Sequence, residues 1–191
     1  MPSVPTPSSP QPSPAGALAT RLCLKCGLCC DGTLFKDVQV NRAGERARLA
    51  ALGMGRLLRP ASSRSQAHNR LPQPCQALHG CACRIYPDRP SRCRNFECLL
   101  FKRVLAGAIP EREAGRTIQT ALRQRDRVRQ LLGQLGDGKE RAALSVRFRL
   151  MRLRFESGPE QDARRRGWYG DLTLAIQDLN VTLSQSFYPG E

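Results

Sequence analysis

The sequence predicts a mainly α-helical protein, in which an irregular, cysteine-rich N-terminal domain precedes a small C-terminal helical bundle. All nine cysteines lie between residues 23 and 98, in a stretch with few large apolar residues. Beyond residue 100 the chain contains three apolar stripes at three- and four-residue spacing, the period of helices that pack on one another. With 191 residues and 40% apolar content, the chain can fill a modest core.

Three regions are predicted: a disordered Pro/Ser-rich tail over residues 1–20, a cysteine region over 21–100 and a helical region over 101–191. The tail has neither the basic segment nor the apolar run of a targeting signal. No stretch approaches the roughly 18 apolar residues that a membrane-spanning helix needs. We therefore expect a cytoplasmic protein without membrane contact. In that compartment thiols stay reduced, and nine cysteines favour metal ligation or redox chemistry over disulfides.

Local patterns predict the elements of the cysteine region. The segment "LFKDVQV", residues 34–40, alternates with period two and predicts a short strand. Asn41 can cap a helix over residues 42–53 that stops at Gly53. Residues 55–74, which include His68, show no sustained period and predict a loop.

The second half is predicted to contain three helices. The first carries a stripe that closes at Gly136, and the second spans residues 139–156, although "VRFRLMRLRF" alternates enough to permit a strand. These stripes are expected to pack together rather than to line a site. The first stripe consists of Ile118, Leu122, Val128, Leu131, Leu132 and Leu135. The second helix has two adjoining apolar faces, one of Ala143, Val146, Leu150 and Leu153 and the other of Leu144, Phe148, Met151 and Phe155. The third stripe consists of Trp168, Leu172, Ile176, Leu179, Leu183 and Phe187.

The charge balance is strongly basic, with 31 Lys and Arg against 16 Asp and Glu and a formal charge of +15. Such an excess is typical of proteins with polyanionic partners. Aromatic residues are almost absent between the basic ones, so base stacking is not expected. A nucleic-acid partner is therefore not predicted, and a basic nucleic-acid-binding zinc module remains an alternative function.

The most specific motif is "CLKCGLCC", residues 23–30. A C-x-x-C pair brings two thiolates to one metal from a tight turn, and Gly27 suits that turn because glycine permits positive φ. C-x-x-C-x-x-C also begins an iron–sulfur motif, in which three thiolates bind one cluster. The spacing allows both. Adjacent Cys29 and Cys30 point their side chains apart, so they serve different metals or only one is a ligand.

A second motif, "PCQALHGCACRIYPDRPSRCRNFEC", supplies the other cysteines. Together the motifs resemble the CxxCxxCC family of zinc- or iron-chelating proteins, also called the YkgJ-like cysteine-cluster family. The resemblance covers residues 23–98 and departs from the pattern at Ala77 and at a ninth cysteine, Cys81, which is the least expected ligand. The matching residues are Cys23, Cys26, Gly27, Cys29, Cys30, Pro74, Cys75, Leu78, Cys83, Ile85, Tyr86, Arg89, Pro90, Cys93, Arg94, Phe96 and Cys98.

The resemblance implies metal binding, with zinc or an iron–sulfur cluster as the cofactor. Two four-coordinate sites need eight ligands, and neither the upstream nor the downstream cysteines supply eight. We therefore expect the two groups to lie together and to nucleate the domain around metal. The disulfide-exchange alternative lacks its usual βαβ context. The expected ligands are Cys23, Cys26, Cys29, Cys30, Cys75, Cys83, Cys93 and Cys98.

Some relatives combine this cysteine region with protein-lysine methylation activity, as in flagellin lysine methylase. An iron–sulfur-dependent protein-modifying enzyme is therefore a second alternative, but no Gly-rich loop follows a strand here and no catalytic residue is predicted. A protein partner is not predicted either. The function expected first is metal binding, with a downstream role that the sequence does not specify.

The charge of the thiolates gives nearby arginines a role. Eight thiolates exceed the charge of two divalent ions, so cations must neutralise the remainder. We expect Arg89 and Arg94 to lie just outside the ligands and to support them. Tyr86 is expected in the core with its hydroxyl satisfied, and His79 in a solvated loop, although a site of three cysteines and His79 is chemically possible.

Overall fold

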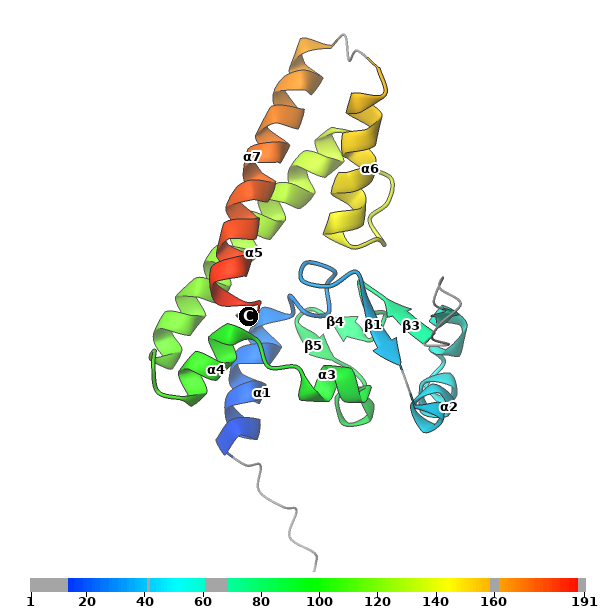
Figure 1. Ribbon diagram of the computed structural model, residues 1–191, viewed down its shortest axis with the longest axis vertical. Helices are drawn as coiled ribbons and strands as arrows, with labels where there is room; N and C mark the ends of the chain where they lie inside the picture. The colour runs from blue at the N-terminus through cyan, green and yellow to red at the C-terminus, as the bar shows by residue number, and fades with distance from the viewer. Residues whose placement is uncertain (1–13, 41, 61–68, 159–161, 189–191) are drawn as a thin grey trace, which may run out of the picture.

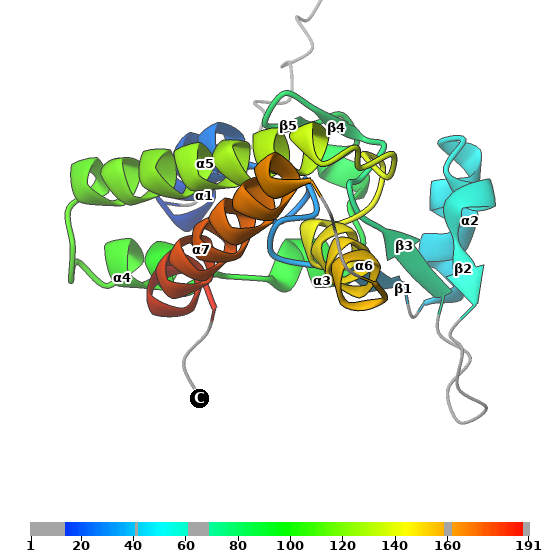
Figure 2. The ribbon, with the colours of Figure 1, turned by 90° about the horizontal axis from the view of Figure 1, so that it is seen from above.

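A computed structural model describes residues 14–40, 42–60, 69–158 and 162–188. These residues form seven α-helices and five short strands, which confirms the predicted mainly α class (Figure 1). The two long helices α5 (Glu111–Gln134) and α7 (Ala163–Ser186) cross and pack on each other, with α6 (Leu144–Glu156) beside α5 (Figure 2). The cysteine-rich part lies against one end of this helical layer.

Helix α1 (Pro14–Cys26) corrects the predicted tail, which was expected to extend to residue 20. Residues 1–13 lie outside the described part. The helix forms because Leu18 and Leu22 recur at i and i+4 and are both buried in the main core, so tertiary packing overrides the Pro/Ser-rich composition. It ends at Gly27, whose φ of +66° confirms the expected left-handed glycine.

A three-stranded antiparallel sheet follows, in the order β1-β3-β2, built from β1 (Asp37–Val40), β2 (Arg59–Pro60) and β3 (Asn69–Pro72). Strand β1 confirms the predicted strand over a shorter length. The predicted loop over residues 55–74 is wrong where a short 3₁₀ helix η1 (Gly55–Leu57), β2 and β3 form. Pairing with β1 buries Leu71, and no local apolar period in the sequence predicts this contact. Asn41 and His68 lie outside the described residues.

Short elements complete the cysteine region. Helix α2 (Ala43–Ala51) confirms the predicted helix, and the last described segments before the bundle are η2 (Tyr86–Asp88), α3 (Ser91–Asn95) and α4 (Leu99–Leu105). A two-residue hairpin joins β4 (Leu78–His79) to β5 (Ala82–Cys83), with Gly80 and Cys81 at its turn.

Two apolar cores hold the fold. The main core joins α1, the turn after it, α4, α5, α6 and α7, so it crosses the boundary predicted near residue 100. A smaller core lies between the sheet, α2 and the hairpin, and among the described residues it contains five buried ones: Val40, Leu49, Met54, Leu71 and Ala77. The division of the chain into separate domains remains a prediction.

The helical half follows its predicted stripes closely. Val128, Leu131, Leu172 and Leu183 are among its fully buried side chains, as expected for helices that bury one another. The second helix begins at Leu144, later than predicted, and is helical throughout the segment that permitted a strand. Of its two predicted faces, Leu144 and Met151 are buried, whereas Leu150 and Leu153 are exposed.

Candidate metal centre

All nine cysteines line one cavity of about 330 Å³ between α1, the hairpin, α3 and the start of α4. They are free thiols in the described fold. Aromatic side chains form part of the wall, and Phe35 meets Phe96 edge to face with ring centroids 4.9 Å apart. The cysteines before residue 31 and those after residue 74 therefore share one enclosed space, as the sequence predicts.

Eight of these thiols fall into two sets of four, which meet at the adjacent pair Cys29 and Cys30. The ionisation of Cys26 is opposed by charges on Cys23 and Cys98, and that of Cys29 by Cys26, Cys98 and Cys23 as well as by its neighbour Cys30. The ionisation of Cys30 is opposed instead by Cys75, Cys83 and Cys93. We name these the Cys98 set and the Cys75 set. The Cys98 set is Cys23, Cys26, Cys29 and Cys98, and the Cys75 set is Cys30, Cys75, Cys83 and Cys93.

The Cys98 set is assembled from two helix ends and the turn between α1 and β1. Cys23 and Cys26 lie three residues apart on the last turn of α1, rather than in the tight turn expected from C-x-x-C, so both face the same side. Cys98 is the N-cap of α4, and its sulfur accepts a hydrogen bond from the backbone N–H of Phe101 at 3.4 Å. An N–H donor of this kind favours the thiolate form that binds metal.

The Cys75 set comes from four separate segments. The backbone N–H of Cys75 donates to the carbonyl of Cys30 at 2.7 Å, which ties the second motif to the first. Cys93 lies on α3, and that helix is held at its start because the N–H of Ser91 donates to Glu45 Oε1 at 2.7 Å. The adjacent residues Cys29 and Cys30 thus belong to different sets, which answers the question raised by the doubled cysteine.

Burial keeps the thiols neutral in the metal-free fold. Desolvation is the main cause that raises the pKa of Cys23 to about 11 and the pKa values of Cys26, Cys30 and Cys93 to about 12. Cys23 is exposed as a residue and also lines the cavity. The thiols line the cavity but do not converge on a common position for a metal ion. Among the described residues, no group of three or more His, Cys, Asp and Glu could hold a metal ion as it stands.

Arg89 brings a positive charge into the wall of the cavity. The guanidinium of Arg89 stacks on Tyr86, with Cζ 3.5 Å from the ring centroid, and both residues line the cavity. The buried Nε of Arg89 has no hydrogen-bond acceptor in the described fold. Asp88, the alternative partner next to it, pairs with Arg48 at 3.8 Å instead. A metal centre built from thiolates would supply the missing acceptor.

The other singled-out residues lie at the margin. Arg94 lines the cavity but is exposed, and His79 is exposed on β4, as its expected solvated position requires. Cys81 also lines the cavity. Its sulfur would lie 3.6 Å from a Cβ added to Gly27, so the hairpin turn touches the end of α1. None of the charge interactions that define the two sets involves Cys81, and its exclusion from the ligands stays a prediction.

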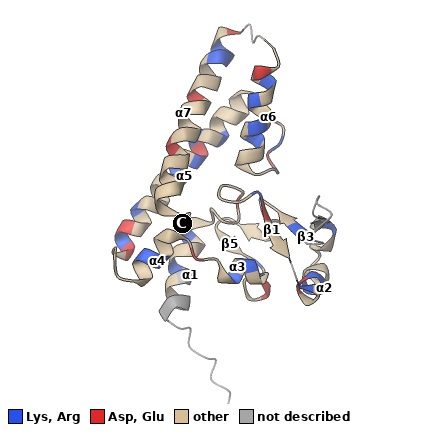
Figure 3. Cartoon of the chain, viewed as in Figure 1, with Lys and Arg blue, Asp and Glu red and all other residues tan. Residues whose placement is uncertain are grey.

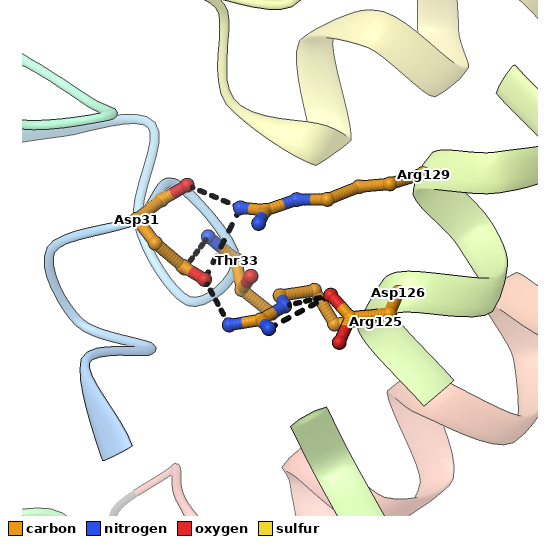
Figure 4. Close-up of polar contacts among 5 residues, drawn as sticks. All are labelled: Asp31, Thr33, Arg125, Asp126 and Arg129. Atoms are coloured by element: carbon orange, nitrogen blue, oxygen red, sulfur yellow. Dashed lines mark hydrogen bonds and ion pairs between the residues drawn. The ribbon is translucent and has the colours of Figure 1, made fainter. Parts of the chain in front are cut away.

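Sequence reasoning missed Asp31, the residue directly after Cys30. Its carboxylate is buried, with 6% of the residue exposed, and accepts hydrogen bonds from Arg125 Nη1 at 2.9 Å and Arg129 Nη2 at 3.1 Å (Figure 4). The backbone N–H of Thr33 adds a third at 2.9 Å. Both arginines belong to α5, so this ion-pair cluster fixes the cysteine turn to the helical half. A lone acidic residue beside a cysteine motif gives no sequence signal for such a contact.

A second device brings the same turn close to α6. At Gly32, φ is +81°, and an added Cβ would lie 2.9 Å from Ala143 Cα. The N–H of Leu144 donates to the Gly32 carbonyl at 2.9 Å. Only glycine allows this approach, because any side chain would force the two segments apart.

The basic residues are distributed over most of the helices and do not gather on a single element (Figure 3). Several are paired with acids, including Arg147, which is buried in an ion pair with Asp137, and Arg21, which binds Glu111 at 3.0 Å.

Metal uptake is expected to release protons at neutral pH. Because burial raises the pKa values of the Cys26, Cys30 and Cys93 thiols, these cysteines are protonated before binding and must lose their protons to bind. Affinity should therefore fall as pH is lowered, since protons compete with the metal. Titration of metal-free protein with zinc in weak buffer at pH 7.5, followed with a pH indicator, measures the release. The Cys81→Ser variant should release as many protons as the wild type, and uptake without proton release would contradict thiol ligation.

Thiols grouped in fours around an enclosed space are the donor arrangement of cysteine-rich metal-binding proteins. Comparison with family models leads to the same class: residues 22–120, just over half of the chain, match the CxxCxxCC family, described as a "Putative zinc- or iron-chelating domain". The chain belongs to this family. No curated protein and no solved structure matches the chain. Within the described residues, no helix combines the length and the apolar character required to span a membrane.

Proposed function

We propose that this protein holds two metal centres, one in each four-cysteine set, and that the Cys98 set binds an iron–sulfur cluster. The observation that carries the proposal is that eight thiols interact in two sets of four around one cavity of about 330 Å³. The proposed ligands are the eight cysteines named as the Cys98 and Cys75 sets. The metal in the Cys75 set is left to be identified by metal counting.

The size of the cavity supports a cluster. Four thiolates around one zinc ion close on a point, because each sulfur lies about 2.3 Å from the metal. In a cubane each thiolate binds its own iron, and inorganic sulfide fills the space between them. The cavity that the thiols line leaves room for a cluster, and the C-x-x-C-x-x-C spacing of Cys23, Cys26 and Cys29 suits one.

The chain would contribute ligation, burial and hydrogen bonds. An iron–sulfur cluster supplies one-electron redox chemistry when bound. The Phe101 N–H donor to Cys98 and the apolar wall around Cys29 are features that tune a cluster potential through hydrogen bonding and low solvent exposure. The reaction or partner that would use this chemistry is not specified by these residues.

Protein purified without oxygen should be coloured, with broad absorption near 400 nm that bleaches on reduction. Iron, zinc and acid-labile sulfide are counted on the same sample, and iron with matching sulfide is the expected result. A colourless protein with two zinc ions and no iron would overturn the iron–sulfur assignment, while leaving the two four-cysteine sets as zinc sites.

Single substitutions test the sorting into sets. Cys98→Ser should abolish the iron–sulfur spectrum and spare the second metal, whereas Cys75→Ser should remove the second metal and spare the spectrum. Cys81→Ser is the matched control, because it changes a thiol in the same cavity and should cost neither centre. Loss of the same centre in Cys98→Ser and Cys75→Ser would contradict the sorting.

Structural zinc in both sets is the second candidate, and the small core of the sheet region favours it. Five buried residues are a thin core for a segment of this length, and metal cross-links can replace apolar burial. Iron–sulfur-dependent protein modification and nucleic-acid binding remain predictions from the sequence.

A further inference from the structure

We propose that Arg89 is a positioning residue shared by both metal centres, with its guanidinium donating hydrogen bonds to sulfur of the Cys98 set and of the Cys75 set. This inference rests on the proposed function. It adds that the two centres are not independent, because one side chain neutralises and orients ligands of both.

The geometry places Arg89 in the shared cavity and holds it there. The guanidinium lies over the ring of Tyr86 at 3.5 Å, a stacking contact that fixes its plane. Arg89 follows η2 directly and precedes the buried Pro90, whose ring restricts the backbone at this point. The side chain is therefore pre-organised rather than free to swing into solvent.

The orphaned donor indicates what Arg89 binds. Its Nε is buried without an acceptor among the described residues, although a buried N–H of a charged group is costly to leave unpaired. Cys23 and Cys93 line the same cavity and come from different sets. Thiolate sulfur, formed when metal binds, is the acceptor that this cavity can offer.

The charge of Arg89 suits a bridging position. Cys23 and Cys98 of one set and Cys75 and Cys93 of the other line the cavity that Arg89 also lines. A guanidinium in that shared wall can stabilise negative charge on thiolates of both sets. The planar guanidinium can donate hydrogen bonds to two acceptors at once in fixed directions. The donors of a lysine ammonium are less constrained in direction.

The test compares Arg89→Gln with Arg92→Gln in the full chain. Arg92 provides the matched control because it lines the same cavity and carries the same charge but is exposed. In chelator competition, Arg89→Gln should weaken metal binding about 10-fold or more at both centres, as is usual when a residue that orients ligands is lost. Where a centre is redox-active, its reduction potential should also fall, because the lost positive charge and hydrogen bonds favoured the reduced form. Arg92→Gln should change neither quantity appreciably.

Arg89→Lys separates charge from geometry and provides a readout if the glutamine variant fails to fold. It should keep part of the electrostatic effect but lose the planar guanidinium, so affinity at both centres should fall between wild type and Arg89→Gln. Effects confined to one centre, effects equal to those of Arg92→Gln, or a lysine variant indistinguishable from wild type would overturn the proposal. Metal counts on the wild type are measured first: absence of two centres there defeats the proposed function itself, whereas two centres insensitive to Arg89 defeat only this inference.

Discussion

Removing metal with a strong chelator is expected to unfold residues 37–95 while the crossed pair of α5 and α7 stays helical. In the part of the sheet region that the structure describes, the core has five buried residues, whereas the helical half shares a core that also includes α1 and α4. Metal-binding free energy is therefore folding free energy for the sheet region, and removing the ligand removes that stabilisation. We expect the largest loss of structure in the β4–β5 hairpin and in α3. Neither element contains a buried residue, although Ala77, directly before the hairpin, is buried.

Hydrogen exchange measured by mass spectrometry can follow the two regions separately. Peptides from residues 37–95 should lose most of their protection after chelation, and peptides from 114–132 should keep theirs. Restoring the metal should restore protection, and Cys81→Ser should behave as the wild type. Unchanged protection in residues 37–95 after complete metal removal would show that the cysteines are not structural ligands.

Asp31→Asn is expected to destabilise the metal-loaded protein by about 3 kcal/mol, because it leaves two partly buried guanidinium groups without their shared carboxylate. The exposed side-chain fractions are 14% for Arg125 and 34% for Arg129, against 7% for Asp31. This loss of stability lies at the low end of the range for broken buried ion pairs, because Arg125 still pairs with Asp126 and Arg129 is one-third exposed. Denaturant unfolding of loaded protein measures the change.

Asp126→Asn is the matched control for this cluster. Asp126 also pairs with Arg125, at 2.7 Å, but its side chain is 60% exposed, so its loss should cost less than about 1 kcal/mol. Because Asp31 directly follows Cys30, the asparagine variant should also weaken metal binding, whereas the control should not. Equal stability of the Asp31 and Asp126 variants would contradict the role of the buried carboxylate as the link between the cysteine turn and α5.

Errors in the predicted elements share one cause, the dominance of long-range packing over local pattern. The Pro/Ser-rich composition before residue 20 predicted a tail, but Leu18 and Leu22 find a buried face on the helical half. The residues of β3 carry no regular alternation, and they form a strand because β1 pairs with them. Conversely, the stripes of α5 and α7 are long and regular, so the local period sufficed to predict both helices.

The sequence by itself determined the family, the metal-binding class and the eight cysteines proposed as ligands, because these depend on residue type and on spacing along the chain. It also determined the helical second half, whose apolar period is local. Only the tertiary structure decided that Cys98 joins Cys23, Cys26 and Cys29 while Cys30 joins the later cysteines. Only it placed Arg89 in the cavity that the cysteines line and Asp31 against α5. The physical reason is that sulfur–sulfur proximity and buried charge pairing are distances between segments remote in sequence, and no local pattern encodes which remote segments the packed cores bring together.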